Sequence, residues 1–433
     1  MTDPTLWIRR ARVRRCLVDA QLPGDREQVL VDLAIRDGRI AALRPAGQVG
    51  PESDARSIDQ DGGEVWPGLI DVHTHLDKGH IWPRAENPDG TFAGAIEAVR
   101  ADREAHWSAS DMRARFAFGL RCADAHGTVA IRTHLDCPPQ LYRTSWQVFR
   151  DLRAEWADRI ALQAASLVTL DDLRERAFAE ALADLVAESA GVFGCVAFLT
   201  ADIQAQLDRV FALAADRGLD LDFHVDETRD PEANSLREVA EAALRCSFES
   251  DILCGHCCSL AAQESAEAER TLDLVREAGI AVVSLPMCNL YLQDRVPGRT
   301  PRWRGVTLLH EMAARGIPVT LASDNCRDPF FAYGDHDMLE VFREAVRIAH
   351  LDRPLGDWPK AVTRTSADLM GLPDAGVIRV GAPADLLLFR ARSDAELLSR
   401  PQSDRIVLRA GRQIDTTPPD YRELDQALAG SAR

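Results

Sequence analysis

Lysine is nearly missing from this chain. Lys78 and Lys360 are its only lysines, so arginine supplies almost all of the 51 basic residues. The 68 acidic residues outnumber them, and the formal net charge is −17. Because a negative surface repels phosphate groups, nucleic acid and anionic membranes are poor candidates as partners.

The chain also lacks long apolar runs and dense cysteine clusters. No stretch approaches the roughly 18 uncharged apolar residues that a membrane-spanning helix needs. The basic N-terminus, MTDPTLWIRRARVRR, has no apolar segment of the kind found in secretory signals. Ten cysteines spread over 433 residues differ from the disulfide framework of a small secreted domain. We therefore expect a cytoplasmic protein with reduced thiols, either monomeric or a homo-oligomer.

The apolar residues that the chain does contain are enough for a large core. Hydrophobic residues make up 46% and charged residues 27%, as in ordinary globular proteins. Residues 1–66 alternate short apolar runs with turn signals such as Asp37-Gly38, and the same style returns over residues 373–433. We expect these two chain ends to pair into one small β-sandwich, with a polar tail at the C-terminus.

The pattern changes over residues 67–372. Short, nearly continuous apolar runs are typical of buried parallel strands, and helical segments separate them. The runs occupy residues 68–76, 127–136, 159–168, 191–198, 219–227, 251–258, 281–288 and 318–325. This pattern predicts an α/β fold, a (β/α)8 TIM barrel, with its active site at the carboxyl ends of the strands. Most of these runs end on a polar or sulfur-bearing residue, including Cys258, Cys288 and Asn325.

Several of the histidines lie at the ends of these apolar runs: His73, His75, His224 and His256. The strand period places His73 and His75 on the same side, where both imidazoles can reach one metal ion. Two half-exposed polar residues on a strand are the plain alternative for this pair. Glu227 follows His224 by three residues, and Asp324 closes the last run. These side chains are expected to form a ring around the barrel mouth.

Several segments resemble those of the metal-dependent amidohydrolase superfamily, and within it the cytosine deaminase group: PGLIDVHTHLDK, IRTHLD, FHVDET, GHCCSL, CNLYLQDR and SDNCRDPFFAYGDHDML. The resemblance implies that one divalent metal ion, Fe²⁺ or Zn²⁺, is bound by His73, His75, His224 and Asp324. It also implies that Glu227 and His256 act directly in catalysis.

The scarcity of lysine bears on the number of metal ions. Members of this superfamily with two metal ions use a carboxylated lysine near the fourth strand, whereas Lys78 comes too early and Lys360 too late. Cys195 could bridge two ions, although a buried core thiol is the plain alternative. We therefore expect a single-metal site.

A mechanism follows from these residue types. The metal ion lowers the pKa of a bound water, Asp324 takes the proton, and His256 steers the resulting hydroxide. Glu227 protonates a ring nitrogen and helps ammonia to leave. The sequence thus predicts hydrolytic deamination of an amino-substituted N-heterocycle, cytosine or a close analogue, by attack of the metal-bound hydroxide.

The residues expected to contact or orient this small substrate lie near the predicted strand ends and in the loops beyond them: His134, Thr169, Gln293, Asn325 and Phe330. Structural packing is the alternative at each of these positions, and for His134 also the support of a neighbouring ligand. The Pro- and Gly-containing stretch with His80, Trp82 and Arg84 is expected to form a loop over the mouth.

The chain departs from the cytosine deaminase pattern at two points. Val168-Thr169 stands where the resembling deaminases carry a Pro-Gln pair that reads the pyrimidine, and Asp324-Asn325 stands where they have two aspartates. The SDNxRD pattern also resembles N-isopropylammelide aminohydrolases, which generally lack a glutamate at the position of Glu227. The alternative function is therefore removal of a substituted amine from an s-triazine, or hydrolysis of another cyclic amidine. A non-catalytic barrel would be expected to lose metal ligands, and none of the expected ligands is missing.

Overall fold

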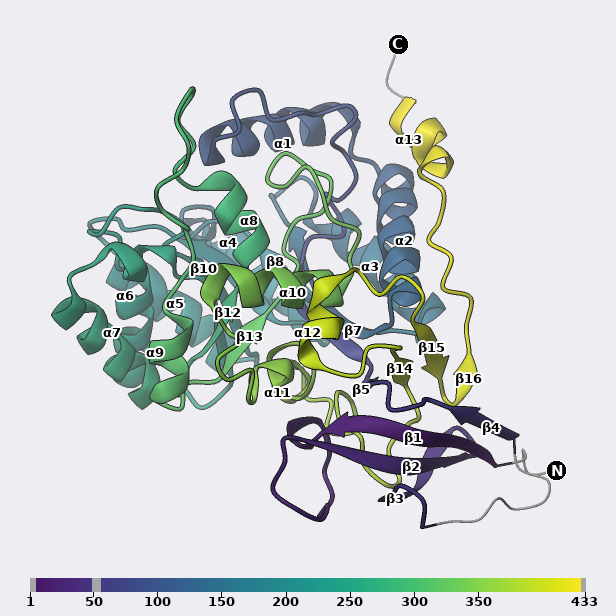
Figure 1. Ribbon diagram of the computed structural model, residues 1–433. Coiled ribbons are helices and arrows are strands. Elements are labelled where there is room, and N and C mark those ends of the chain that lie inside the picture. Colours follow the sequence, from purple (N-terminus) through teal and green to yellow (C-terminus); the bar gives the residue numbers. More distant parts are fainter. Residues whose placement is uncertain (1–4, 49–55, 430–433) are drawn as a thin grey trace. The chain divides into compact units, whose positions relative to one another are not determined.

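The computed structural model describes residues 5–48 and 56–429, and the chain divides into two compact units (Figure 1). The first unit comprises Met1–Asp71, Arg121–Ala130 and Asp337–Pro418, and the second comprises Val72–Leu120, Ile131–His336 and Pro419–Arg433. Among the described residues, no helix has the length and apolar character needed to cross a membrane.

The first unit contains two four-stranded sheets. One has the order β3-β2-β1-β4 and consists of β1 (Leu6–Arg14), β2 (Gln28–Arg36), β3 (Arg39–Pro45) and β4 (Arg56–Asp59). β1 runs antiparallel to β2 and parallel to β4. Asp37 and Gly38 join β2 to β3 with φ values of 51° and 74°, the left-handed conformations of a tight hairpin turn. The Asp-Gly signal in the sequence thus marks a real turn.

Strands from both chain ends meet in the second sheet, which has the order β16-β15-β14-β5. Its strands are β5 (Val65–Pro67), β14 (Leu386–Leu388), β15 (Ile406–Arg409) and β16 (Arg412–Gln413). β5 is antiparallel to β14. One cluster of buried apolar side chains draws on both sheets, with Ile8, Val31 and Leu33 from the first and Leu386 and Leu408 from the second. Burial of this apolar surface holds the early and late segments together.

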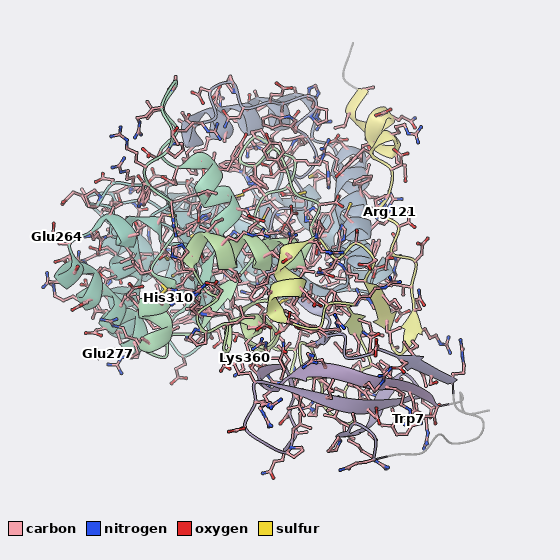
Figure 2. The ribbon with its side chains drawn as sticks, viewed as in Figure 1. Trp7, Arg121, Glu264, Glu277, His310 and Lys360 are labelled. Atoms are coloured by element: carbon pink, nitrogen blue, oxygen red, sulfur yellow. The ribbon has the colours of Figure 1, made fainter. Side chains whose placement is uncertain are left out.

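Helices complete the first unit: α10 (Met338–Ala349), α11 (Arg364–Leu369), α12 (Asp394–Ser399) and the 3-10 helices Arg15–Leu17 and Trp358–Val362. Lys360, labelled in Figure 2, lies in the last of these and pairs with Asp357 at 2.7 Å. This lysine is a partly exposed surface residue, in contrast to Lys78.

Glu64 is a buried carboxyl group in the first unit. Its side chain accepts hydrogen bonds from Trp66 Nε1 at 2.9 Å and from Gln28 Nε2 at 3.0 Å. Burial raises the pKa of Glu64 from its ordinary value of 4.5 to about 7. The group therefore favours folding fully below pH 4.5, and this contribution is lost as the pH rises through about 7.

We expect the unfolding free energy of Glu64→Gln to increase relative to that of the wild type as the pH rises. Between pH 5 and 8.5 the difference in unfolding free energy should shift by about 3 kcal/mol toward the variant, because each pKa unit corresponds to about 1.4 kcal/mol. Urea unfolding of both proteins at the two pH values measures the shift. Asp404→Asn, at an exposed carboxyl group of the same unit, is the control. A difference that stays constant with pH would contradict the assignment.

The second unit is built around parallel strands. A three-stranded sheet has the order β6-β7-β8, and a five-stranded sheet has the order β13-β12-β11-β10-β9. The strands are β6 (Leu69–Thr74), β7 (Thr128–Asp136), β8 (Ala161–Leu167), β9 (Phe193–Ala197), β10 (Leu221–Val225), β11 (Ile252–His256), β12 (Ala281–Ser284) and β13 (Val319–Leu321). Parallel bridges join Thr74 to Asp324 and Ala165 to Val192. Both ends of the three-stranded sheet are thereby linked to the larger sheet.

Helices separate these strands along the chain, and α4 to α7 lie on the outer side of the strands in Figure 1. They are α1 (Phe92–His106), α2 (Ala109–Ala125), α3 (Tyr142–Glu155), α4 (Arg176–Glu188), α5 (Ile203–Ala215), α6 (Ser235–Arg245), α7 (Ser265–Glu277), α8 (Pro286–Leu292), α9 (Leu309–Ala314) and α13 (Asp425–Ala429). The 3-10 helices are Asp172–Arg174, Cys258–Ala262 and Tyr421–Leu424. In α6, Leu236, Val239, Ala240 and Ala243 are buried at helical spacing, which directs one face inward.

Each of the eight apolar runs contains a strand, and the strands are shorter than the runs. The run at 281–288 is strand only to Ser284, because Pro286 begins α8 and places Cys288 on that helix. Proline suits the first turn of a helix, where its missing N–H group costs no hydrogen bond. Cys258 likewise lies in a 3-10 helix beyond β11.

Candidate metal centre and active site

The predicted metal ligands come from three strand ends of the second unit. His73 lies on β6 with His75 just beyond it, His224 lies on β10, and Asp324 follows β13. The backbone locks the first and last of these ends together: the Asp324 N–H donates to the carbonyl of His73 at 2.9 Å, and the His75 N–H donates to the carbonyl of Asp324 at 3.2 Å. Asp324 has a left-handed φ of 62°, a conformation that aspartate adopts more readily than most residues.

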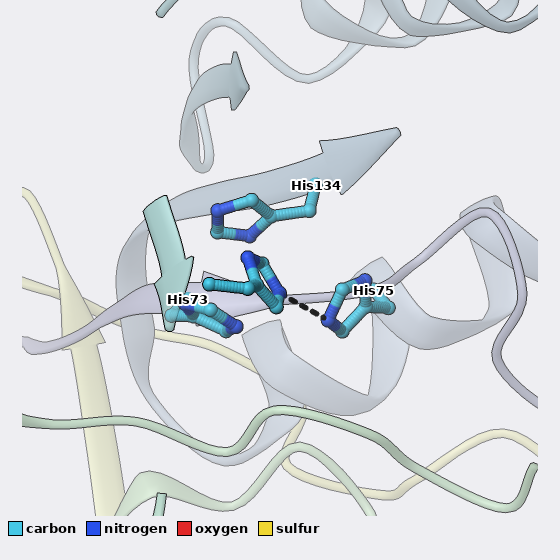
Figure 3. A group of neighbouring side chains, drawn as sticks. His73, His75 and His134 are labelled. Atoms are coloured by element: carbon cyan, nitrogen blue, oxygen red, sulfur yellow. Dashed lines mark hydrogen bonds between the residues drawn. The ribbon is translucent and has the colours of Figure 1, made fainter. Parts of the chain in front are cut away.

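The donor atoms of these residues converge. Nε2 of His75 lies 3.2 Å from Asp324 Oδ1 and 3.5 Å from Nε2 of His224. Nε2 of His73 lies 3.5 Å from the same carboxylate oxygen. Figure 3 shows the rings of His73 and His75 grouped around a common point, with the dashed contact made by His75. Two imidazole nitrogens that face each other so closely are typical of ligands aimed at one cation.

The electrostatics of this cluster also fit a divalent metal ion. Both ring nitrogens of His73 and both oxygens of Asp324 are buried, and they have no hydrogen-bond partner among the described residues. Burial lowers the pKa of His75 and His224 well below the ordinary value, so these imidazoles are neutral and offer lone pairs. Burial alone would raise the pKa of Asp324, but His73 and His75 hold it well below its usual range. Neutral imidazoles beside a carboxylate form a suitable site for such an ion.

His134 belongs to this cluster rather than to the surface of a substrate cavity. Its donor atom lies within 4.8 Å of those of His73, His75 and His224, and its ring centroid is 4.0 Å from that of His73 (Figure 3). Nε2 of His134 lies 3.0 Å from Asp222 Oδ1, and the side chain is fully buried. Asp222 thus orients His134 beneath the other imidazoles, a supporting arrangement that is common at metal sites.

Glu227 and His256 lie beside the candidate metal ligands, and both contact Asn289. Nδ2 of Asn289 is 3.1 Å from Glu227 Oε1 and 3.1 Å from His256 Nδ1, and Glu227 Oε1 is 3.5 Å from His256 Nδ1. Burial followed by the nearby charge of Asp324 raises the pKa of Glu227 well above its ordinary value, whereas burial lowers that of His256 to about 3. A carboxyl group whose protonated form is favoured by burial and an imidazole whose neutral form is favoured by burial therefore face the same space. Asn289 lies on α8 and contacts both side chains.

A cavity of about 300 Å³ opens over these groups. His75, His224, Glu227, His256 and Asp324 line it, together with apolar side chains that include Phe92, Val168, Val196, Phe198 and Phe330. Three of the predicted substrate contacts, Thr169, Asn325 and Phe330, also line it. The lining does not include His134 or Gln293, and Gln293 instead donates to the backbone carbonyl of Glu227 at 3.2 Å.

The structure adds polar residues to this cavity that the sequence reasoning did not assign to it. Lys78 is 5% exposed, lines the cavity, and pairs with Asp136 at 3.0 Å, while Arg103 of α1 pairs with the same carboxylate at 2.8 Å. Asp77 accepts from the Asp136 N–H at 2.6 Å. The signal was present, because one of only two lysines lies three residues after His75 of the H-x-H segment. The contribution of α1, which also supplies Ile96 and Val99 to the lining, left no such mark.

Other residues singled out in the sequence lie away from the cavity lining. His80 is buried, Arg84 pairs with Asp102 and Asp111 at 2.7 Å each, and neither residue lines the cavity, so the expected cover over the mouth stays a prediction. Cys195 is a buried free thiol on β9 and does not line the cavity. Cys254, Cys257 and Cys258 are buried free thiols as well.

Known proteins resemble this chain over most of its length. Residues 108–415 match the model of the amidohydrolase family. A pterin deaminase of Rhizobium rhizogenes is 55% identical over 406 residues, which cover 94% of this chain and 92% of the relative.

Solved structures of this kind include a 5-methylcytosine deaminase from Klebsiella pneumoniae liganded with 5-fluorocytosine. It is 26% identical with a TM-score of 0.81, and the match covers 94% of this chain and 97% of that one. An N-isopropylammelide isopropylaminohydrolase from Burkholderia multivorans, 24% identical with a TM-score of 0.76, shares the fold over 96% of this chain and 100% of its own.

Proposed function

Because the chain belongs to the amidohydrolase family, as its motifs indicated, we propose that it hydrolytically deaminates an aminoheterocycle of the pterin type. The observation that carries the proposal is the cavity of about 300 Å³, which is lined by candidate metal ligands, the Glu227 carboxyl group and apolar side chains. Pockets with a few placed polar groups among apolar walls are typical of heterocycle-binding sites. The pterin deaminase that is 55% identical supports a two-ring substrate.

We propose that His73, His75, His224 and Asp324 hold one divalent metal ion, Zn²⁺ or Fe²⁺. Such an ion would lower the pKa of a coordinated water toward neutrality. The donor set of imidazoles and a carboxylate suits either ion. His134, held by Asp222 at 3.0 Å, then supports the ligands from below.

The side chains account for every proton in the reaction. Asp324 accepts a proton from water as the oxygen bonds to the ring carbon, and Glu227 donates its proton to the adjacent ring nitrogen. Asn289 donates to Nδ1 of His256, so Nε2 carries the hydrogen and can steer the attacking oxygen. Asp324 then protonates the amino group, the C–N bond breaks, and ammonia leaves. Glu227 recovers a proton from the new hydroxyl group, which leaves a ring carbonyl.

Val168 and Thr169 favour a substrate other than cytosine. Both line the cavity, at the position where the resembling cytosine deaminases read the pyrimidine with a glutamine. Neither a valine nor a threonine can form the paired hydrogen bonds of an amide side chain. Cytosine and 5-methylcytosine remain the second candidates, supported by the likeness to the Klebsiella enzyme.

We also propose the finer architecture expected from the sequence. The strands β6 to β13 close into a (β/α)8 barrel, which the bridges Thr74–Asp324 and Ala165–Val192 support. Residues 67–372 form this catalytic domain, and residues 1–66 and 373–433 form the β-sandwich. The pairing of β5 with β14 supports the joining of the two chain ends.

Product release from a substrate panel tests the proposed function. The zinc-loaded protein is given pterin, cytosine, 5-methylcytosine and N-isopropylammelide, and both ammonia and isopropylamine are measured. We expect ammonia from pterin with a kcat/KM at least about 10-fold above that for cytosine. The reason is that cytosine would leave polar atoms without a hydrogen-bond partner in this cavity, which costs about 1–3 kcal/mol. A preference for cytosine would overturn the substrate assignment, and isopropylamine as the main product would overturn deamination itself.

A further inference from the structure

A second cluster of metal-binding side chains lies in the second unit, apart from the lining of the catalytic cavity. The donor atoms of His80, Cys326 and His336 all lie within 4.8 Å of one another. Their side chains are buried, with 1%, 2% and 2% exposure. The proposed reaction uses none of them. We propose that these three residues bind a structural Zn²⁺ ion.

Short backbone connections place the three side chains together. The His80 N–H donates to the carbonyl of Cys326 at 3.0 Å, and the Trp82 N–H donates to the carbonyl of Arg327 at 2.8 Å. The segment after β6 is thereby joined to the segment after β13. His80 brings one imidazole from the first segment, and the second brings the thiol and the other imidazole. An ion held by all three would fasten the two segments that carry His75 and Asp324.

The backbone is strained at both histidines. His80 has a φ of 65° and His336 a φ of 55°, in the left-handed region that costs a residue with a side chain roughly 1–2 kcal/mol. The catalytic residues His256 and Asp324 show the same conformation, with φ values of 69° and 62°. Strain of this kind persists where the surrounding structure fixes a side chain for a purpose.

Helix α2 leaves a gap for one of the rings. A Cβ atom on Gly119 would lie 3.0 Å from Nε2 of His336 and 2.8 Å from Cδ2 of Leu76. Glycine inside a helix costs about 1 kcal/mol relative to alanine. The helix therefore keeps a destabilising residue at the position where the His336 ring must fit. Phe118 packs against the other ring, with its centroid 4.8 Å from that of His80.

The chemistry of the donors fits zinc. Both ring nitrogens of His80 are buried and have no hydrogen-bond partner among the described residues. Burial lowers the pKa of His80 well below its ordinary value, so the ring is neutral and offers a lone pair. Coordination would satisfy one of these nitrogens, which otherwise costs roughly 1–3 kcal/mol. Two imidazoles and one thiolate form a donor set that binds Zn²⁺ in preference to Mg²⁺ or Ca²⁺, which favour oxygen ligands.

An entry path for the ion lies beside His80. A cavity of about 380 Å³ is lined by His80, Arg327, Tyr421 and Asp425, the last from α13. Tyr421 donates to Asp335 at 3.0 Å, and its ring lies 4.2 Å from the Arg327 guanidinium carbon. Figure 1 shows α13 beside the upper part of α2, and the ring of Tyr421 lies 5.6 Å from that of Phe118 on α2. The C-terminal segment thus lines the cavity next to His80.

Cobalt substitution separates this cluster from the catalytic one. The catalytic cluster contains no thiol, so a thiolate-to-cobalt charge-transfer band reports on Cys326 alone. The full chain is stripped of metal and reconstituted with Zn²⁺ or Co²⁺, and the bound metal is counted. We expect two equivalents per chain and a charge-transfer band. Cys326→Ser and His80→Gln should each lose one equivalent, and Cys326→Ser should also lose the band.

Cys122→Ser, at a buried thiol of α2, is the matched control and should keep both equivalents and the band. One equivalent of bound metal per chain and no charge-transfer band in the wild-type protein would overturn the proposal. This test needs no variant, so it remains decisive even if Cys326→Ser does not fold. Two equivalents and the band in Cys326→Ser would overturn it as well. The experiment measures bound metal only, so its result is independent of the substrate assignment.

Discussion

Glu227→Gln is expected to lower kcat for heterocycle deamination by about 10²- to 10⁴-fold, the usual contribution of a positioned acid. The buried carboxyl group holds its proton because its pKa lies well above the ordinary value, and the amide cannot supply that proton to a ring nitrogen. Both glutamate and glutamine at position 227 have an oxygen that can accept the hydrogen bond from Asn289. Bound metal should therefore stay at the wild-type level, and the measurement is kcat together with metal content.

A matched control lies on the same loop. Glu232 is an exposed carboxyl group five residues further along, and Glu232→Gln should leave kcat within about twofold, since exposed substitutions rarely matter. Full activity of Glu227→Gln with metal bound would remove Glu227 from the acid-base role. Loss of metal in that variant would instead make it a ligand.

Removal of the divalent metal is expected to abolish deamination and to lower the midpoint of thermal unfolding. The chelated protein should retain less than about 1% of the rate, since metal activation of water provides several kcal/mol of the acceleration. Binding of an ion at about 1,000 times its Kd stabilises the folded state by about 4 kcal/mol. Added Zn²⁺ or Fe²⁺ should restore both properties.

His224→Asn tests which cluster is responsible. The variant should stay inactive after Zn²⁺ is added back, because one catalytic ligand is missing, whereas the cluster of His80, Cys326 and His336 is unchanged. Elemental analysis should show the loss of one equivalent. A metal-free protein that still deaminates at the original rate would rule out the metal-dependent mechanism.

The positions of the strands in the second unit could be read from the sequence, because buried parallel strands carry apolar side chains on both faces. Each predicted run overlaps a strand from β6 to β13. The ends of the strands were less predictable. Pro286 starts a helix inside the run 281–288, and an apolar helix turn has the same composition as an apolar strand.

The polar residues that gather at the candidate metal centre could be picked out in the sequence, whereas the lining of the cavity could not. Their role as metal ligands stays a prediction. The H-x-H spacing of His73 and His75 is visible in the sequence. By contrast, Lys78, Asp136 and Arg103 meet only because β6, β7 and α1 come together in the fold. His134 lies outside the cavity lining, with its ring beside that of His73, which favours the supporting role over substrate contact. Gln293 follows the end of α8, and no short sequence pattern predicts where its side chain points.

Membership of the amidohydrolase family, inferred from the motifs, is confirmed by the family match and by the relative at 55% identity. The choice of cytosine stays a prediction. The proposed metal ligands would serve a step common to many substrates, whereas recognition of the heterocycle would depend on cavity-lining positions such as Thr169, whose role stays a prediction. One sequence shows where such positions depart from a pattern, as Val168 and Thr169 do, without showing which ring fits.

The most direct test of hydrolytic deamination follows the oxygen and nitrogen atoms of a single reaction. The zinc-loaded protein converts pterin in water labelled with heavy oxygen, and the products are analysed by mass spectrometry alongside an ammonia assay. We predict one labelled oxygen in each product molecule and one ammonia released for each molecule converted. Product without labelled oxygen, or ring conversion without ammonia, would contradict the account.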